Sequence, residues 1–176
     1  MLNDELTQME SICGRLDQVR SLLSSNDFPD LEDIANWYSF LVELKTIQGN
    51  FNNDVSFLAT MLAKQYLEEK FGLQNYNAAD KPQGAPGLDI DVRLPDGKRL
   101  VAEIKTTSPY LPNDLGAQQK ATFKKDFRKL TGAEADVKLF FLTEQKTFQL
   151  MKAPKYRIQL SGVIVVLLTT NEVFTA

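Results

Sequence analysis

The chain has 176 residues, of which 43% are hydrophobic and 24% are charged, as expected for one compact domain with a short additional segment. The formal net charge of -3 excludes a basic surface over the whole chain, so any contact with nucleic acid must be local. The absence of histidine and the single cysteine exclude histidine-dependent hydrolases, histidine-ligated zinc and an internal disulfide.

Nothing in the sequence predicts secretion or membrane insertion. The first 20 residues carry four acidic side chains and no apolar run, so they do not form a signal peptide. The most apolar stretch, 163–168, is far too short to cross a bilayer. We therefore expect a cytoplasmic protein.

Three helices are predicted in the first 70 residues. Apolar residues at spacings of three and four predict an amphipathic helix over 2–23, which either packs on its own domain or forms a dimer interface. Its apolar positions are Leu2, Leu6, Met9, Cys13, Leu16 and Leu23. A break at 24–29 precedes a second helix over 31–45, and a third is expected over 54–70 with Asn53 or Asp54 as its N-cap. These patterns predict an N-terminal helical segment over 1–50 and a core over 51–176.

The core alternates strands and helices. An irregular stretch over 72–87 is followed by two strands with alternating apolar residues, 88–94 and 99–106. A helix over 115–130 buries Phe123, Phe127 and Leu130, and apolar strands follow at 137–142 and 163–168, joined by an irregular link. This order predicts a mixed α/β domain with a central sheet flanked by helices.

The turn between the first two strands determines which side chains face each other. Pro95-Asp96-Gly97 favours a type I turn with Gly97 in the left-handed conformation, which pairs positions whose numbers add up to 192. Asp89 then lies opposite Glu103, and Asp91 lies opposite Val101. A two-residue turn would place Asp89 and Glu103 on different faces of the sheet.

The apolar pattern favours the three-residue turn. In that register Leu88, Ile90 and Val92 share one face with Leu100, Ala102 and Ile104. Asp89, Asp91, Glu103 and Lys105 share the other face, whereas a slip of one residue would bury unpaired charges.

Two opposed carboxylates repel each other unless a cation lies between them. Oxygen ligands from Asp89, Glu103 and the backbone carbonyl of Ile104 suit Mg²⁺, with Mn²⁺ as a substitute. Lys105 lies on the same side of the strand, where it could hold or deprotonate an attacking water.

These residues resemble the PD-(D/E)xK nuclease superfamily, which includes many type II restriction endonucleases. The resemblance rests on Pro86-Gly87-Leu88-Asp89-Ile90 and Ala102-Glu103-Ile104-Lys105, and it covers about 54–142. It implies a restriction-endonuclease-like fold, Asp89 and Glu103 as metal ligands, and Lys105 as the catalytic lysine. Leu88 stands where the family has proline, which leaves Asp91 as a rival for the role of Asp89. An acidic residue from the preceding helix sometimes joins the metal site of this family, and Asp54 is the nearest match.

A basic helix face offers a local surface for DNA. Lys120, Lys124 and Arg128 form a row with four-residue spacing, which is either a solvated face or a phosphate-binding face. The predicted DNA-binding residues are Thr106, Thr107, Gln119, Lys120, Lys124, Lys125 and Arg128. The loop from 74 to 84 is a candidate for base contacts.

The sequence therefore predicts a Mg²⁺-dependent DNA endonuclease of the type II restriction kind. Cutting both strands of DNA requires two sites, so a homodimer is expected, and a cognate methyltransferase is a partner that such a system would include. One alternative is a repair, junction-resolving or mobile-element nuclease of the same superfamily. Another is a nuclease-like module that binds DNA or a protein without cutting.

Overall fold

The computed structural model describes residues 1–25, 28–81 and 84–176, and the chain forms two compact units, 1–54 and 55–176. The division lies four residues from the boundary expected at 50/51. Residues 26–27 of the predicted break and 82–83 of the predicted loop lie outside the described residues. No helix in the described ranges is long and apolar enough to cross a membrane.

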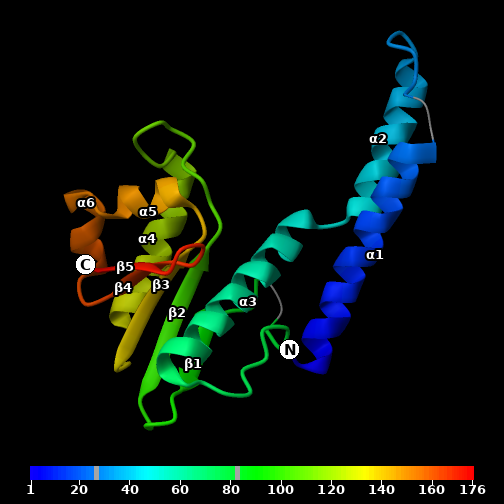
Figure 1. The fold of residues 1–176 in the computed structure, drawn as a ribbon. Coiled ribbons are helices and arrows are strands. Elements are labelled where there is room, and N and C mark those ends of the chain that lie inside the picture. Colours follow the sequence, from blue (N-terminus) through cyan, green and yellow to red (C-terminus); the bar gives the residue numbers. More distant parts are fainter. Residues whose placement is uncertain (26–27, 82–83) are drawn as a thin grey trace. The chain divides into compact units, whose positions relative to one another are not determined.

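The first unit contains two helices that lie side by side, α1 (Asn3–Ser25) and α2 (Ile34–Gln48) (Figure 1). Both were predicted, but the apolar stripe of α1 was wrong in part. Leu6, Leu16 and Leu23 are exposed, whereas Ile12 and Leu22 are buried. The helix carries apolar residues on more than one side, so the spacing alone could not show which side would be covered.

The third helix, α3 (Phe51–Phe71), begins three residues before Asp54. The prediction that Asn53 or Asp54 caps this helix was therefore wrong. Asp54 lies within the first turn, where acidic side chains are favoured by the helix dipole. Its Oδ1 is 2.6 Å from Nη2 of Arg15 on α1, within the first unit.

The second unit is built on one mixed sheet of five strands in the order β1-β2-β3-β4-β5. The strands are β1 (Ile90–Arg93), β2 (Arg99–Lys105), β3 (Val137–Leu142), β4 (Ile164–Leu167) and β5 (Glu172–Thr175). The two outer pairs are antiparallel and the pairs β2/β3 and β3/β4 are parallel. The mixed α/β class is confirmed, while β5 was not predicted.

Helices cover both faces of the sheet (Figure 1). Ala63, Tyr66 and Leu67 of α3 pack on one face against alternate strand residues such as Leu100 and Phe141. On the other face lie α4 (Ala117–Gly132), α5 (Gln145–Met151), α6 (Pro154–Arg157) and the 3-10 helix η1 (Ile158–Leu160). The link over 143–162 was thus wrongly expected to be irregular, because α5, α6 and η1 are too short to show a clear helical period.

The β1–β2 hairpin has the predicted register. Ile90 pairs with Ala102 and Val92 with Leu100, so paired residue numbers add up to 192. Leu94 N donates to Lys98 O at 2.8 Å, and Gly97 has the left-handed φ of 85° that the three-residue turn requires. One side chain was misplaced: Leu88 packs with the α4 side of the sheet, because β1 begins only at Ile90.

Candidate functional site

The carboxylate of Asp89 lies near Glu103, although the paired residues of the hairpin begin only at Ile90. Oδ2 of Asp89 accepts a hydrogen bond of 2.8 Å from the backbone N of Ile104, the residue after Glu103. This bond continues the hairpin ladder with a side chain in place of a strand carbonyl. It fixes the Asp89 carboxylate beside the Glu103 position.

Glu103 is almost completely buried, with 1% of its surface exposed. Oε1 accepts a hydrogen bond of 2.9 Å from Nζ of Lys129 on α4. Burial and the nearby charges of Asp89 and Asp126 together raise the pKa of Glu103 to about 7, and Lys129 opposes the rise. The pKa of Lys129 is itself raised, because Glu103 and Asp126 outweigh the effect of burial.

Lys105 lies on the same face and pairs with a carboxylate from α4. Its Nζ is 2.8 Å from Oδ2 of Asp126, and Oδ1 of Asp126 is 3.4 Å from Nζ of Lys129. Lys105, Asp126, Lys129 and Glu103 therefore form a chain of alternating charges between β2 and α4. Asp126 Oδ2 is buried and makes no hydrogen bond within the described residues, so its contact with Lys105 is an ion pair only.

Asp126 and Lys129 were not predicted to belong to the site. Asp126 falls on the same helical face as Phe123, Phe127 and Leu130, which were correctly predicted to be buried. An acidic residue on a buried stripe needs a cation, so this position was a usable signal. Lys129 follows Asp126 by three residues, one of the spacings at which helical side chains meet.

The two rival carboxylates have other partners. Both oxygens of Asp91 accept hydrogen bonds from Arg99, at 2.9 and 2.7 Å. These hydrogen bonds lower the pKa of Asp91 below its ordinary value. Asp54 pairs with Arg15 in the first unit. The contacts thus favour Asp89 over Asp91 beside Glu103, and a part for Asp54 or Asp91 in metal binding remains a prediction.

The donor set fits a hard divalent cation that retains several water ligands. Asp89 and Glu103 contribute two neighbouring carboxylates. Among the described residues, no three acidic or cysteine side chains are grouped closely enough to enclose a metal. Mg²⁺ commonly binds through one or two carboxylates and completes its shell with water and phosphate oxygens, which matches this pair.

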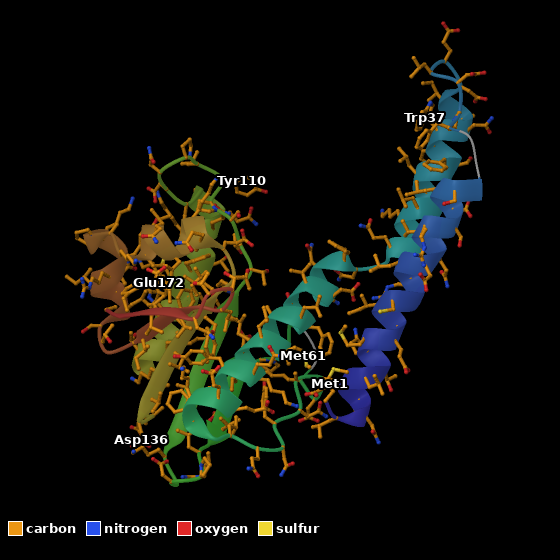
Figure 2. The ribbon with its side chains drawn as sticks, in the orientation of Figure 1. Met1, Trp37, Met61, Tyr110, Asp136 and Glu172 are labelled. Atoms are coloured by element: carbon orange, nitrogen blue, oxygen red, sulfur yellow. The ribbon has the colours of Figure 1, made fainter. Side chains whose placement is uncertain are left out.

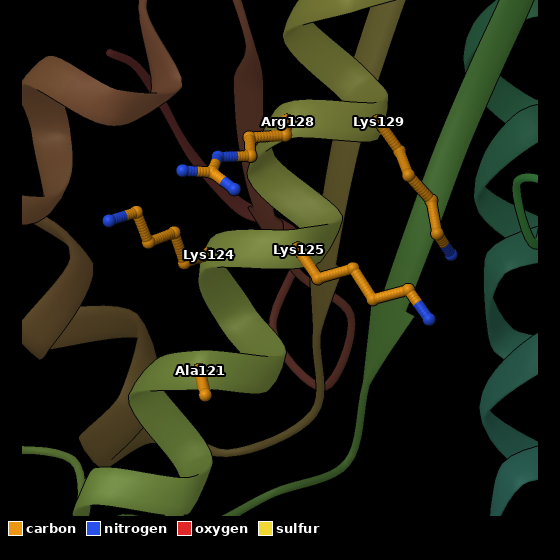
Figure 3. A pocket seen from close by; sticks show the side chains of 5 residues that line it. All are labelled: Ala121, Lys124, Lys125, Arg128 and Lys129. Atoms are coloured by element: carbon orange, nitrogen blue, oxygen red, sulfur yellow. The ribbon is translucent and has the colours of Figure 1, made fainter.

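Four cations on α4 surround a shallow surface hollow of about 610 Å³. Figure 3 shows Lys124 and Arg128 pointing to one side of the helix and Lys125 and Lys129 to the other. Ala121 also lines the hollow. Lys124, Lys125 and Arg128 were predicted to bind phosphate. The structure adds Lys129, which links this basic face to the carboxylates.

The other predicted DNA-binding residues have contacts within the protein. Lys120 Nζ lies 2.7 Å from Oδ2 of Asp114. Gln119 is buried, donates to Ser108 O, and accepts from the backbone N of Tyr110 and Gly116. It thereby anchors the loop from which exposed Tyr110 projects (Figure 2).

Thr106 and Thr107 are half-buried directly after β2. Thr107 O accepts a hydrogen bond from the hydroxyl of Thr147 on α5. This bond connects the segment after β2 to α5. Any DNA contact of these threonines would therefore be made by a segment that is fixed to the rest of the unit.

Comparisons with protein-family models, curated proteins and solved structures find no match for this chain.

Proposed function

We propose that this chain is a Mg²⁺-dependent endodeoxyribonuclease with a PD-(D/E)xK, restriction-endonuclease-like fold. The observation that carries the proposal is the carboxylate of Asp89, held by the backbone N of Ile104 near the carboxylate of Glu103, with Lys105 two residues after Glu103 on β2. Placing a half-buried carboxylate beside a buried one is unfavourable for the fold, so the pair indicates a ligand. A restriction-type role, with a methyltransferase in the same system, is the form of this activity that we favour.

Each residue of the site has a role under this proposal. Asp89, Glu103 and the carbonyl of Ile104 would hold the ion, which when bound supplies Lewis-acid activation of water and stabilises charge on the phosphate. Lys105 would orient the attacking water or take its proton. Lys124, Lys125 and Arg128 would hold the DNA backbone, in the manner of sequence-independent phosphate contacts.

Plasmid digestion tests the activity directly. The parent protein is expected to cut in Mg²⁺ or Mn²⁺ and not in EDTA, and Glu103→Ala and Lys105→Ala should each abolish cutting. Asp96→Ala is the matched control, because it removes an exposed acidic side chain from the turn of the same hairpin. Metal-dependent cutting that survives both site substitutions would refute the assignment.

A second candidate is a module that binds DNA without cutting it. The observation in its favour is that both predicted reactive groups already have ion-pair partners, Lys105 with Asp126 and Glu103 with Lys129. Binding of duplex DNA with no cleavage in Mg²⁺ or Mn²⁺, together with no loss of binding in Glu103→Ala, would favour this function.

We also propose that the chain acts as a homodimer through α2. None of the residues in α2 is buried, although the helix is predominantly apolar. Trp37 and Phe40 form aromatic contacts with Phe28, while a separate stripe at spacings of three and four is exposed. This stripe consists of Leu31 (88% exposed) in the turn before α2 and of four residues on α2, Ile34 (71%), Tyr38 (72%), Leu41 (54%) and Val42 (43%).

The size of the α2 stripe suits a second copy of the chain. If each of these side chains presents about 200 Å² when fully exposed, the stripe offers roughly 650 Å², most of the ~800 Å² that each partner of a stable interface buries. A helix with apolar residues on two sides buries both of them only by packing against a partner on each side. Two copies would bring two cutting sites together, one for each DNA strand.

A further inference from the structure

Lys129 lies where three parts of the second unit meet. Its Nζ is 2.9 Å from Glu103 Oε1 on β2, 3.1 Å from the carbonyl oxygen of Gly87 before β1, and 3.4 Å from Asp126 Oδ1 on α4. The ammonium thus occupies the oxygen-lined position beside Glu103. A divalent cation bound to Glu103 would compete for this same carboxylate.

The same side chain also belongs to the basic face. Lys129 lines the hollow with Lys124, Lys125 and Arg128, and it points to the same side of α4 as Lys125 (Figure 3). Its side chain is about one-third exposed, whereas that of its partner Asp126 is almost fully buried. A lysine has a flexible four-carbon stem, so its ammonium can move between two acceptors without moving the helix.

We propose that Lys129 is an internal counter-ion that competes with the metal for Glu103 and, once released, contacts a DNA phosphate. This inference rests on the proposed function and adds a means of regulation to the same site. In the absence of a divalent ion, Lys129 compensates the buried charge of Glu103, which would otherwise be costly. When Glu103 takes a cation, Lys129 is free to swing towards the phosphate-binding face.

The ion pair of Lys105 makes this exchange feasible. Asp126 contacts both lysines, one through each oxygen, so it retains Lys105 when Lys129 moves away. No buried carboxylate of this cluster is then left without a cation. Lys105 therefore stays paired with Asp126 whether or not a metal is bound, whereas Lys129 moves.

Calorimetric titration with Mn²⁺ in the absence of DNA tests the competition. Lys129→Gln removes the competing charge and keeps an amide donor for Glu103, so it is expected to bind Mn²⁺ about tenfold more tightly than the parent. Lys125→Gln, four residues earlier on the same helix and exposed, should leave the Mn²⁺ affinity unchanged. Lys129→Arg retains the charge and should remain close to the parent.

DNA binding provides the second readout. With Ca²⁺, under conditions that leave the duplex intact, Lys129→Gln should reduce the slope of log affinity against log salt by about 0.9, the value of one phosphate contact. In EDTA the slopes of parent and variant should agree, because Lys129 is then held by Glu103. Lys125→Gln should reduce the slope under both conditions.

Equal or weaker Mn²⁺ binding by Lys129→Gln, or a change in salt slope that is the same with and without the ion, would overturn the inference. If the Gln variant does not fold, Lys129→Met makes the same test. The proposed function fails separately, if the parent binds Mn²⁺ through Glu103 yet never cuts DNA. Loss of Mn²⁺ binding in Glu103→Gln shows that the ion measured is the one at this site.

Discussion

Replacing Glu103 with glutamine should stabilise the metal-free protein at alkaline pH. Glu103 has a pKa of about 7 in the folded chain, against an ordinary value of 4.5, because burial and neighbouring acidic groups disfavour its charge. The glutamine has the same size and can still accept a hydrogen bond from Lys129. It removes a charge that the fold accommodates poorly when no cation is bound.

The size and the sign of the effect follow from proton linkage. Below pH 4.5 Glu103 is protonated in the folded and unfolded chain alike, and between 4.5 and 7 only the folded chain retains the proton. The stability of the parent therefore falls as the pH rises through this window, and above pH 7 the loss is complete. A shift of this size corresponds to about 3 kcal/mol.

Urea denaturation in EDTA at several pH values measures this effect. The stability gained by Glu103→Gln over the parent should grow by about 2 kcal/mol from pH 5 to pH 8. Asp91→Asn is the matched control with the opposite sign, because Arg99 lowers the pKa of Asp91 and its charge stabilises the fold. A Glu103→Gln variant that is less stable than the parent at pH 8 would refute the reasoning.

Three further results are expected. Gly97→Ala should cost about 1–2 kcal/mol in urea denaturation, because the residue has a left-handed φ of 85°, and an unchanged midpoint would contradict this turn. Replacing both Lys124 and Arg128 with glutamine should lower the slope of log DNA affinity against log salt by about 2. An unchanged slope would indicate that DNA binds another face of the protein. Tyr38→Glu should convert a dimer into a monomer in light scattering, and a parent that is already monomeric would exclude the α2 interface.

Local chemistry explains why the hairpin was predicted correctly. The Pro95-Asp96-Gly97 turn and the alternation of apolar residues over two short strands determine the register together, without reference to the rest of the chain. The helix α4 was predicted for a similar reason, since three buried residues repeat at helical spacing. In both segments, neighbours in sequence supply most of the information.

The segments that sequence reasoning missed depend on distant partners. The seven-residue helix α5 buries Thr147, Phe148 and Met151 against the sheet, a pattern too short to distinguish from a loop. The four residues of β5 become a strand by pairing with β4, and Phe174 packs against the core on the α4 side. Neither element has enough apolar residues of its own to reveal its structure.

The candidate site shows the same division between local and distant contacts. Glu103 and Lys105 point to one face of β2, and the sequence therefore suggested that they act as a pair. Side chains two residues apart on a strand are separated by about 6.6 Å along it, so a helix packed above them can place a different partner on each. Lys129 pairs with Glu103, which lies 26 residues away in sequence, and Asp126 pairs with Lys105. The packing of α4 on β2 thus decides which cation balances each acid, and this packing determines whether Glu103 can accept a metal.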